Sequence, residues 1–408
     1  MSALKWMFAV VLLLTGGDAR AALITATYCV TYSVSYTDGA SGDFLTGSTY
    51  PARGVDIRFV KPDNSYFDYY ADINGCATPV LDNATTYTVK SLRKASLNDN
   101  YLAVLIQGAG GYGIGASTMY THIPVSGQTY SYTTGVTDGI NVMAAATRAL
   151  YAHDAGLSNE TFEFWVDECP GDSDNSCYSA DKIYINPTNG DPDEKFIIAH
   201  EMGHAVTDLK NGNNGMNSDY DANVGDCSPA YDNGGHKYNS KEYASAAWTE
   251  GVANAYAAFS FNDDVVGVST DCEYQARNTQ DWNLDGDTND PGDVEVFSCE
   301  DGTGLPAGFT QGSDWLGAHC LATGAIHNRG LEYDVLRHMW DMRTNEAVTV
   351  ANLFDIVDKA NPNSWTISGA GTTSDYPTPR MSSGAFTVGG SSMQNDWDSQ
   401  ATFNGLDP

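Results

Sequence analysis

Alternating apolar and polar side chains over the first third of the chain predict a β-rich region. Turn-forming residues such as those at 61–64 separate the apolar segments. The pattern predicts a small antiparallel β-sandwich, Ig-like or transthyretin-like, over residues 22–130. The segments expected to form its strands are 26–36, 55–60, 86–89 and 101–106.

From about residue 138 the apolar side chains recur every three or four residues, which predicts helices. Two short strand-like runs lie among them, and residues 210–240, rich in Asn, Gly and Asp, predict a long surface loop. After Asn361 we expect a Gly/Ser/Thr-rich tail. Residues 131–408 therefore read as one α+β domain with a helical C-terminal half. Helices are expected at 139–157, 241–260, 328–342 and 349–360, and strands at 162–166 and 182–185.

Residues 1–21 have the composition of a secretory signal peptide. Lys5 precedes an apolar run that is too short to cross a bilayer, and Ala19-Arg20-Ala21 forms a small-x-small cleavage site. No later stretch is long and apolar enough to span a membrane. The sequence thus predicts a secreted protein, extracellular or periplasmic.

The cysteines fit an oxidising compartment, because all eight follow the predicted cleavage site and none forms a CxxC pair. We expect four disulfides between sequence neighbours, with Cys169–Cys177 the clearest because its loop is short.

The chain is strongly acidic, with 20 basic and 52 acidic residues and a formal net charge of −32. Such a surface repels nucleic acid and anionic membranes, so neither is expected as a partner. The charge does not define an oligomeric state.

The segment His200-Glu201-Met202-Gly203-His204 matches the H-E-x-x-H pattern of zinc peptidases. Two imidazoles four residues apart share one face of a helix, where they can bind one zinc ion. The preceding residues predict that helix: Asp191 as N-cap, Pro192 at its first position and Glu194 completing a capping box.

Two histidines leave zinc short of one protein ligand. A metzincin would have Gly and His at positions 207 and 210, but these are Thr207 and Lys210. A glutamate from a second helix is the alternative. Glu250 is favoured over Glu242 because it lies among Trp and small residues that allow close helix packing.

These segments resemble the gluzincins. His200–Asp208, HEMGHAVTD, is similar to the zinc helix of thermolysin-like peptidases, and Trp248–Tyr256 resembles their W-x-E-G-x-A-x-x-Y segment. The resemblance implies zinc bound by His200, His204 and Glu250, with Glu201 as general base. It also implies that Asn254, where thermolysin relatives have Asp, and Asp208 support the zinc-binding side chains.

Two further features remain candidates. A donor to the tetrahedral oxyanion is expected within residues 325–333, where His327 and Tyr333 are both available. A D-x-N-x-D-G segment predicts a structural calcium loop without its usual closing carboxylate. Its ligands would be Asp281, Asn283, Asp285 and Asp287.

The sequence thus predicts a secreted zinc endopeptidase that hydrolyses extracellular proteins or peptides. The alternative is a non-catalytic binding or adhesion protein on a zincin scaffold, although an intact Glu201 favours catalysis. Residues 22–130 remain open to two interpretations, a retained binding domain or an inhibitory propeptide.

Overall fold

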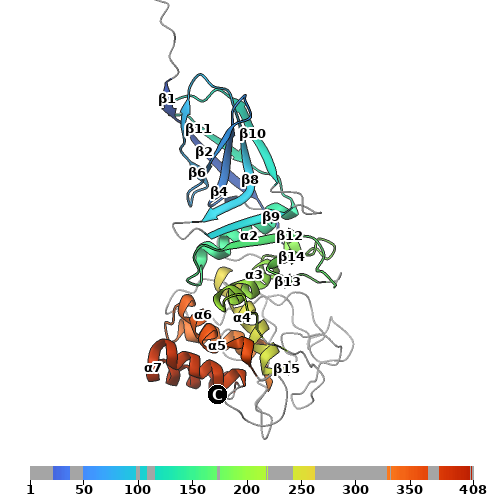
Figure 1. Cartoon of the computed structure of the whole chain (residues 1–408), viewed down its shortest axis with the longest axis vertical. Coiled ribbons are helices and arrows are strands. Elements are labelled where there is room, and N and C mark those ends of the chain that lie inside the picture. The colour runs from blue at the N-terminus through green and yellow to red at the C-terminus, as the bar shows by residue number, and fades with distance from the viewer. Residues whose placement is uncertain are drawn as a thin grey trace, which may run out of the picture.

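The computed structural model describes residues 22–36, 49–97, 102–107, 115–171, 175–216, 218, 242–261, 329–330, 332–365, 376–404 and 406. The predicted signal peptide at 1–21 lies outside them. Figure 1 shows an elongated molecule with the N-terminal strands at one end and helices α5–α7 at the other. Helices α3 and α4 lie between these two ends.

Two sheets built largely from N-terminal strands form the β-rich end. Within the described residues, one sheet has eight strands in the order β13-β14-β12-β9-β8-β4-β5, with β10 paired to β8; the other has β11-β2-β3, with β6 paired to β2. The strands are β1 (Leu23–Thr25), β2 (Thr27–Ser33), β3 (Thr49–Pro51), β4 (Val55–Val60), β5 (Tyr66–Tyr70), β6 (Cys76–Ala77), β7 (Val80–Asp82), β8 (Tyr87–Leu97), β9 (Leu102–Gln107), β10 (Ala116–His122), β11 (Thr129–Thr133), β12 (Thr161–Val166), β13 (Cys177–Ser179), β14 (Lys182–Ile185), β15 (Glu242–Tyr243) and β16 (Arg329–Gly330).

Strand alternation places apolar side chains between the two sheets. Tyr28, Val30 and Tyr32 on β2 are buried and alternate with half-buried neighbours. The ring of Tyr28 lies edge-on to Phe59 on β4, with centroids 5.0 Å apart. The sheets thus pack face to face, as the alternation predicted.

The expectation of purely antiparallel pairing is wrong at one place, because β11 runs parallel to β2. Parallel neighbours need a long connection, and almost the whole N-terminal region separates these two strands. The chain therefore has a mixed α/β architecture with antiparallel and mixed sheets.

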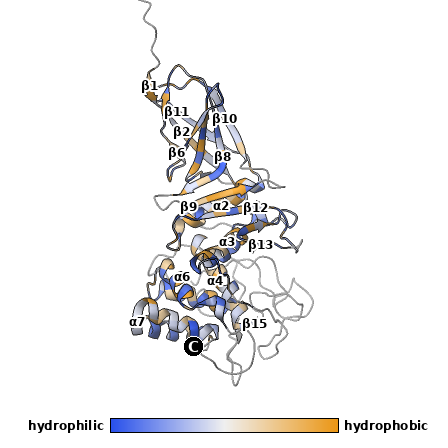
Figure 2. Ribbon diagram, viewed as in Figure 1, coloured by the Kyte–Doolittle hydropathy of each residue, from blue (hydrophilic) through white to orange (hydrophobic). Residues whose placement is uncertain are grey.

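The eight-stranded sheet does not stop at residue 130. Strand β8 has 11 residues; its first part pairs with β10 and its last part with β9. Strand β9 then pairs in parallel with β12, and β12 with β14. In Figure 2, β9 is among the most hydrophobic segments, as expected of a central strand.

The helices form one continuous apolar core with this sheet, on the same face that packs against the smaller sheet. They are α2 (Asp138–Ala152), η1 (Asp191–Asp193), α3 (Lys195–Lys210), α4 (Ala244–Phe261), α5 (Glu332–Thr344), α6 (Val350–Lys359), η2 (Pro362–Ser364) and α7 (Pro377–Phe403). Every residue of α4 is buried, so α4 is the central helix of this part. None of the described helices combines the length and apolar character that a membrane crossing requires.

Two details of the helices differ from the sequence predictions. Helix α3 begins at Lys195, after a 3-10 turn, and Asp191 accepts a hydrogen bond from Ser176 Oγ (2.6 Å) instead of capping it. The expected Gly/Ser/Thr tail contains the 27-residue helix α7, which is broken only at Gly390.

Two disulfides lie within the described residues, Cys29–Cys76 and Cys169–Cys177. Both join sequence neighbours, as predicted. The remaining four cysteines, and the candidate calcium ligands at 281–287, lie outside the described residues.

Candidate metal centre

Helices α3 and α4 bring the candidate ligands together because small residues let their backbones approach closely. A Cβ atom added to Gly203 would lie 2.7 Å from Cα and 2.9 Å from the carbonyl oxygen of Ala253 on α4. Only a residue without a side chain fits there. Gly203 stands between the two histidines, so this contact point lies beside the site.

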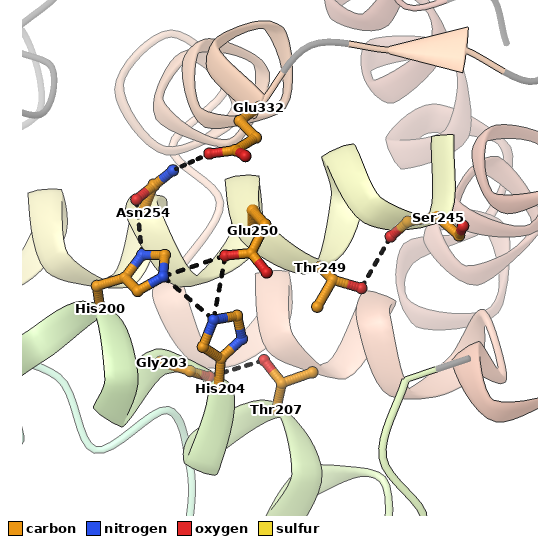
Figure 3. A network of polar contacts seen from close by, with 9 residues as sticks. All are labelled: His200, Gly203, His204, Thr207, Ser245, Thr249, Glu250, Asn254 and Glu332. Atoms are coloured by element: carbon orange, nitrogen blue, oxygen red, sulfur yellow. Dashed lines mark hydrogen bonds and ion pairs between the residues drawn. The ribbon is translucent and has the colours of Figure 1, made fainter. Parts of the chain in front are cut away.

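Three donor atoms converge at this crossing (Figure 3). His200 Nε2 lies 3.1 Å from Glu250 Oε2, His204 Nε2 lies 3.2 Å from the same oxygen, and the two imidazole nitrogens are 3.1 Å apart. Within the described part of the chain, these three residues form the one such group of potential metal ligands. Glu250 is almost fully buried, and each histidine keeps a small exposed fraction.

The spacing of the three atoms fits a zinc ion. Tetrahedral zinc with bonds of about 2.0–2.1 Å places its ligand atoms roughly 3.3–3.4 Å apart. The observed distances of 3.1–3.2 Å come close to that value without adjustment. Two imidazoles and one carboxylate are also a typical donor set for catalytic zinc.

The hydrogen bonds of His200 also favour a cation. Its Nδ1 lies 2.7 Å from Asn254 Oδ1, and Asn254 Nδ2 donates to Glu332 Oε2 at 3.2 Å. The amide oxygen of Asn254 can only accept, so His200 Nδ1 carries a proton. In the neutral imidazole, Nε2 then presents its lone pair to Glu250 and His204, which is the arrangement of a metal ligand.

The field around His200 is negative. Burial by itself lowers the pKa of this imidazole, but the hydrogen bond to Glu250 and the charges of nearby carboxylates outweigh burial and raise the pKa to about 9. Glu201 is one of those carboxylates and is itself buried on α3. A field that favours a proton at this point favours a metal cation for the same reason.

The structure separates the other predicted site residues into two groups. Asn254 contacts His200, as its position on α4 suggested. Asp208 does not join this contact: it accepts hydrogen bonds from Tyr178 Oη (2.7 Å) and from the backbone N–H of Gly215 (2.5 Å). Its role is to fix the end of α3 against β13, because these partners satisfy both of its oxygens.

Three candidates cannot be placed against the site. His327 lies outside the described residues. Tyr333 is the second residue of α5, and Glu242 lies on β15, where its backbone pairs with Gly330; the side chains of both lie outside the described part. The group of three donors contains Glu250, the glutamate that helix packing favoured.

Glu332 is the residue that sequence reasoning missed. It lies in the first turn of α5, next to the Tyr333 considered for the oxyanion, and it is 1% exposed. A single glutamate that follows Arg329, Gly330 and Leu331 matches no motif, so the sequence alone does not indicate a role for it. Only the packing of α5 on α4 brings it to Asn254.

A known protein family matches the middle of the chain. Residues 146–296 match the family model of the mycolysin C-terminal domain. The matched segment includes His200, Glu201, His204 and Glu250, and it ends before Glu332. The match points to a thermolysin-like family of secreted peptidases. No curated protein matches the chain.

Proposed function

We propose that this chain is a secreted zinc-dependent endopeptidase. The observation that carries the proposal is the convergence of His200 Nε2, His204 Nε2 and Glu250 Oε2 within 3.2 Å of one another. These residues would hold the metal, and the match to the mycolysin C-terminal domain supports a peptidase as the class of enzyme.

Zinc and Glu201 would then have separate roles in the reaction. Zinc, when bound, supplies Lewis-acid chemistry that brings the pKa of water close to neutrality. Glu201 would accept the proton of the attacking water and deliver it to the leaving amine. Glu201 is buried on α3 and directly follows His200, which supports this role because the carboxyl group is held beside the metal ligands.

Strand β13 is a candidate for binding the peptide substrate. It is an end strand of the eight-stranded sheet within the described residues, it pairs antiparallel with β14, and the Cys169–Cys177 disulfide anchors its first residue. Tyr178 on this strand bonds Asp208 of α3, so β13 is held beside the zinc helix. An extended peptide can add to such an edge through backbone hydrogen bonds.

The test compares casein hydrolysis by wild type and Glu201→Gln, with zinc measured in both. We expect the variant to retain zinc, because no ligand changes, and to lose about 10²–10⁴-fold in turnover through loss of the general base. Glu160→Gln is the control, since that residue lies on the loop before β12 and not in the site.

Two results would contradict the proposal. Equal turnover in wild type and Glu201→Gln would remove Glu201 from the mechanism. Wild type that binds zinc but hydrolyses neither casein nor a peptide library would favour the non-catalytic zincin scaffold.

A further inference from the structure

A chain of hydrogen bonds leads from the metal centre to a buried carboxylate on another helix. His200 Nδ1 bonds Asn254 Oδ1 at 2.7 Å, and Asn254 Nδ2 bonds Glu332 Oε2 at 3.2 Å. The three residues come from α3, α4 and α5, as Figure 3 shows. The chain therefore connects the three helices that surround the site.

The two members of this chain that follow His200 are shielded from solvent. Asn254 and Glu332 are each 1% exposed. Solvent screens a charge weakly at such a depth, so the carboxylate of Glu332 acts on its neighbours over several ångströms. It is one of the groups whose negative charge reaches His200.

Helix α5 is held against α4 by a second glycine. A Cβ atom added to Gly251 would lie 2.4 Å from Cβ of Val335 and 2.7 Å from the carbonyl oxygen of Glu332. Gly251 directly follows Glu250, so the close approach of α5 occurs beside the third ligand. The position of Glu332 is thus fixed by backbone packing.

We propose that Glu332 is a positioning residue that strengthens zinc binding through Asn254. This inference rests on the proposed zinc site. A carboxylate that accepts from the Asn254 amide polarises it, which makes Oδ1 a stronger acceptor for the His200 N–H. A stronger bond at Nδ1 fixes the ring and makes Nε2 a better electron donor to a metal. The pair of Asn254 and Glu332 supplies, from two helices, the negative partner that an amide alone lacks.

The first variant is Glu332→Gln. The amide at position 332 can still accept the hydrogen bond from Asn254, so the geometry stays and only the charge is lost. We expect zinc affinity, measured by competition with a chromophoric chelator, to fall about 10–100-fold. Asp341→Asn is the matched control: Asp341 is also a buried acid of α5, and it bonds Asn404 and Asn345. Its zinc affinity should equal that of wild type.

The second variant returns the charge to the chain by adding Asn254→Asp to Glu332→Gln. The order of donor and acceptor between positions 254 and 332 is then reversed, and a carboxylate accepts directly from His200. We expect zinc affinity to return to within about threefold of wild type or to exceed it.

Each outcome decides between the possibilities. Equal zinc affinity of Glu332→Gln, Asp341→Asn and wild type overturns the inference, and so does a folded double variant that binds at least tenfold more weakly than wild type. If Glu332→Gln does not fold, as judged by circular dichroism, the double variant alone makes the test. Wild type that binds no zinc would instead refute the proposed metal site, whatever the variants do.

Discussion

Two buried histidines show how the surroundings of one side chain set its charge. His200 lies among carboxylates, which outweigh burial and raise its pKa to about 9. His338 on α5 is fully buried against the indole rings of Trp248 and Trp397, with ring centroids 5.8 Å and 4.2 Å away. Burial lowers the pKa of His338 to about 3. The surroundings of His200 thus favour a positive charge, and those of His338 disfavour one.

The low pKa of His338 predicts loss of stability in acid. The unfolded chain binds a proton at this histidine below about pH 6.5, whereas the folded chain does not until about pH 3. The stabilisation is therefore complete above pH 6.5 and is lost as the pH falls toward 3. We expect the slope that His338 contributes to approach about 1.4 kcal/mol per pH unit as the pH falls below 6, measured from urea unfolding between pH 7 and 5.

The comparison is with His338→Phe, which keeps a ring between the two tryptophans and cannot titrate. Other groups titrate in both proteins and cancel in the difference between their slopes. The free energy of unfolding of wild type should fall below that of the variant progressively as the pH decreases. Parallel curves would show that His338 titrates with the same pKa in the folded and the unfolded chain.

Packing between whole helices places the ligands, and it depends on glycine. Gly203→Ala forces α3 away from α4, because the added methyl group meets the backbone of Ala253 at 2.7 Å. We expect a loss of about 1–3 kcal/mol in the free energy of unfolding. Zinc affinity should also fall, since α4 carries Glu250. Thermal unfolding with and without a chelator, and zinc titration, measure the two effects.

The control for this change is Gly135→Ala in the loop between β11 and α2, where no heavy atom lies within 4 Å of the added Cβ. This variant should keep its zinc affinity and its stability, because the methyl group meets only open space. A Gly203→Ala protein with the zinc affinity of Gly135→Ala would mean that α3 and α4 need not approach closely.

Periodicity predicted the elements that bury one face, such as β4 at Val55–Val60, which the structure reproduces. It failed for α7, whose Gly, Ser and Thr residues are poor helix formers. Trp397 and Met381 on this helix are fully buried, and Gly384 packs against the carbonyl oxygen of Ile356. Tertiary contacts therefore stabilise a helix that local propensity does not favour.

Some residues of the candidate site can likewise be predicted from the sequence, and others only from the way the helices pack. The i, i+4 spacing of His200 and His204 follows from one helix, so it can be read directly from the sequence. Glu250 could be proposed from its small neighbours. The contact between Asn254 and Glu332 depends on how α5 crosses α4, and no local pattern encodes that crossing.

In the whole molecule, the β-rich end and the metal centre share one framework. Strand β9 lies between β8 and β12 in the same sheet, so residues from both sides of position 130 pair directly. Asn141 of α2 adds a second link. It bonds the backbone of Ser35 after β2, and it donates to Asp193 just before the zinc helix at 2.8 Å.

This continuity predicts that residues 22–130 are retained in the active protein and are not removed as a propeptide. Cleavage near residue 131 would take β8 and β9 away from β12 and expose the apolar side chains that they cover, among them Phe164.

We expect N-terminal sequencing and intact mass of protein recovered from the medium to give a start near residue 22. A chain expressed from residue 131 should not yield folded protein, because its sheet would lack a central strand. An active protein that begins near residue 131 would show that the rest of the sheet folds without β9. The propeptide interpretation would then be correct.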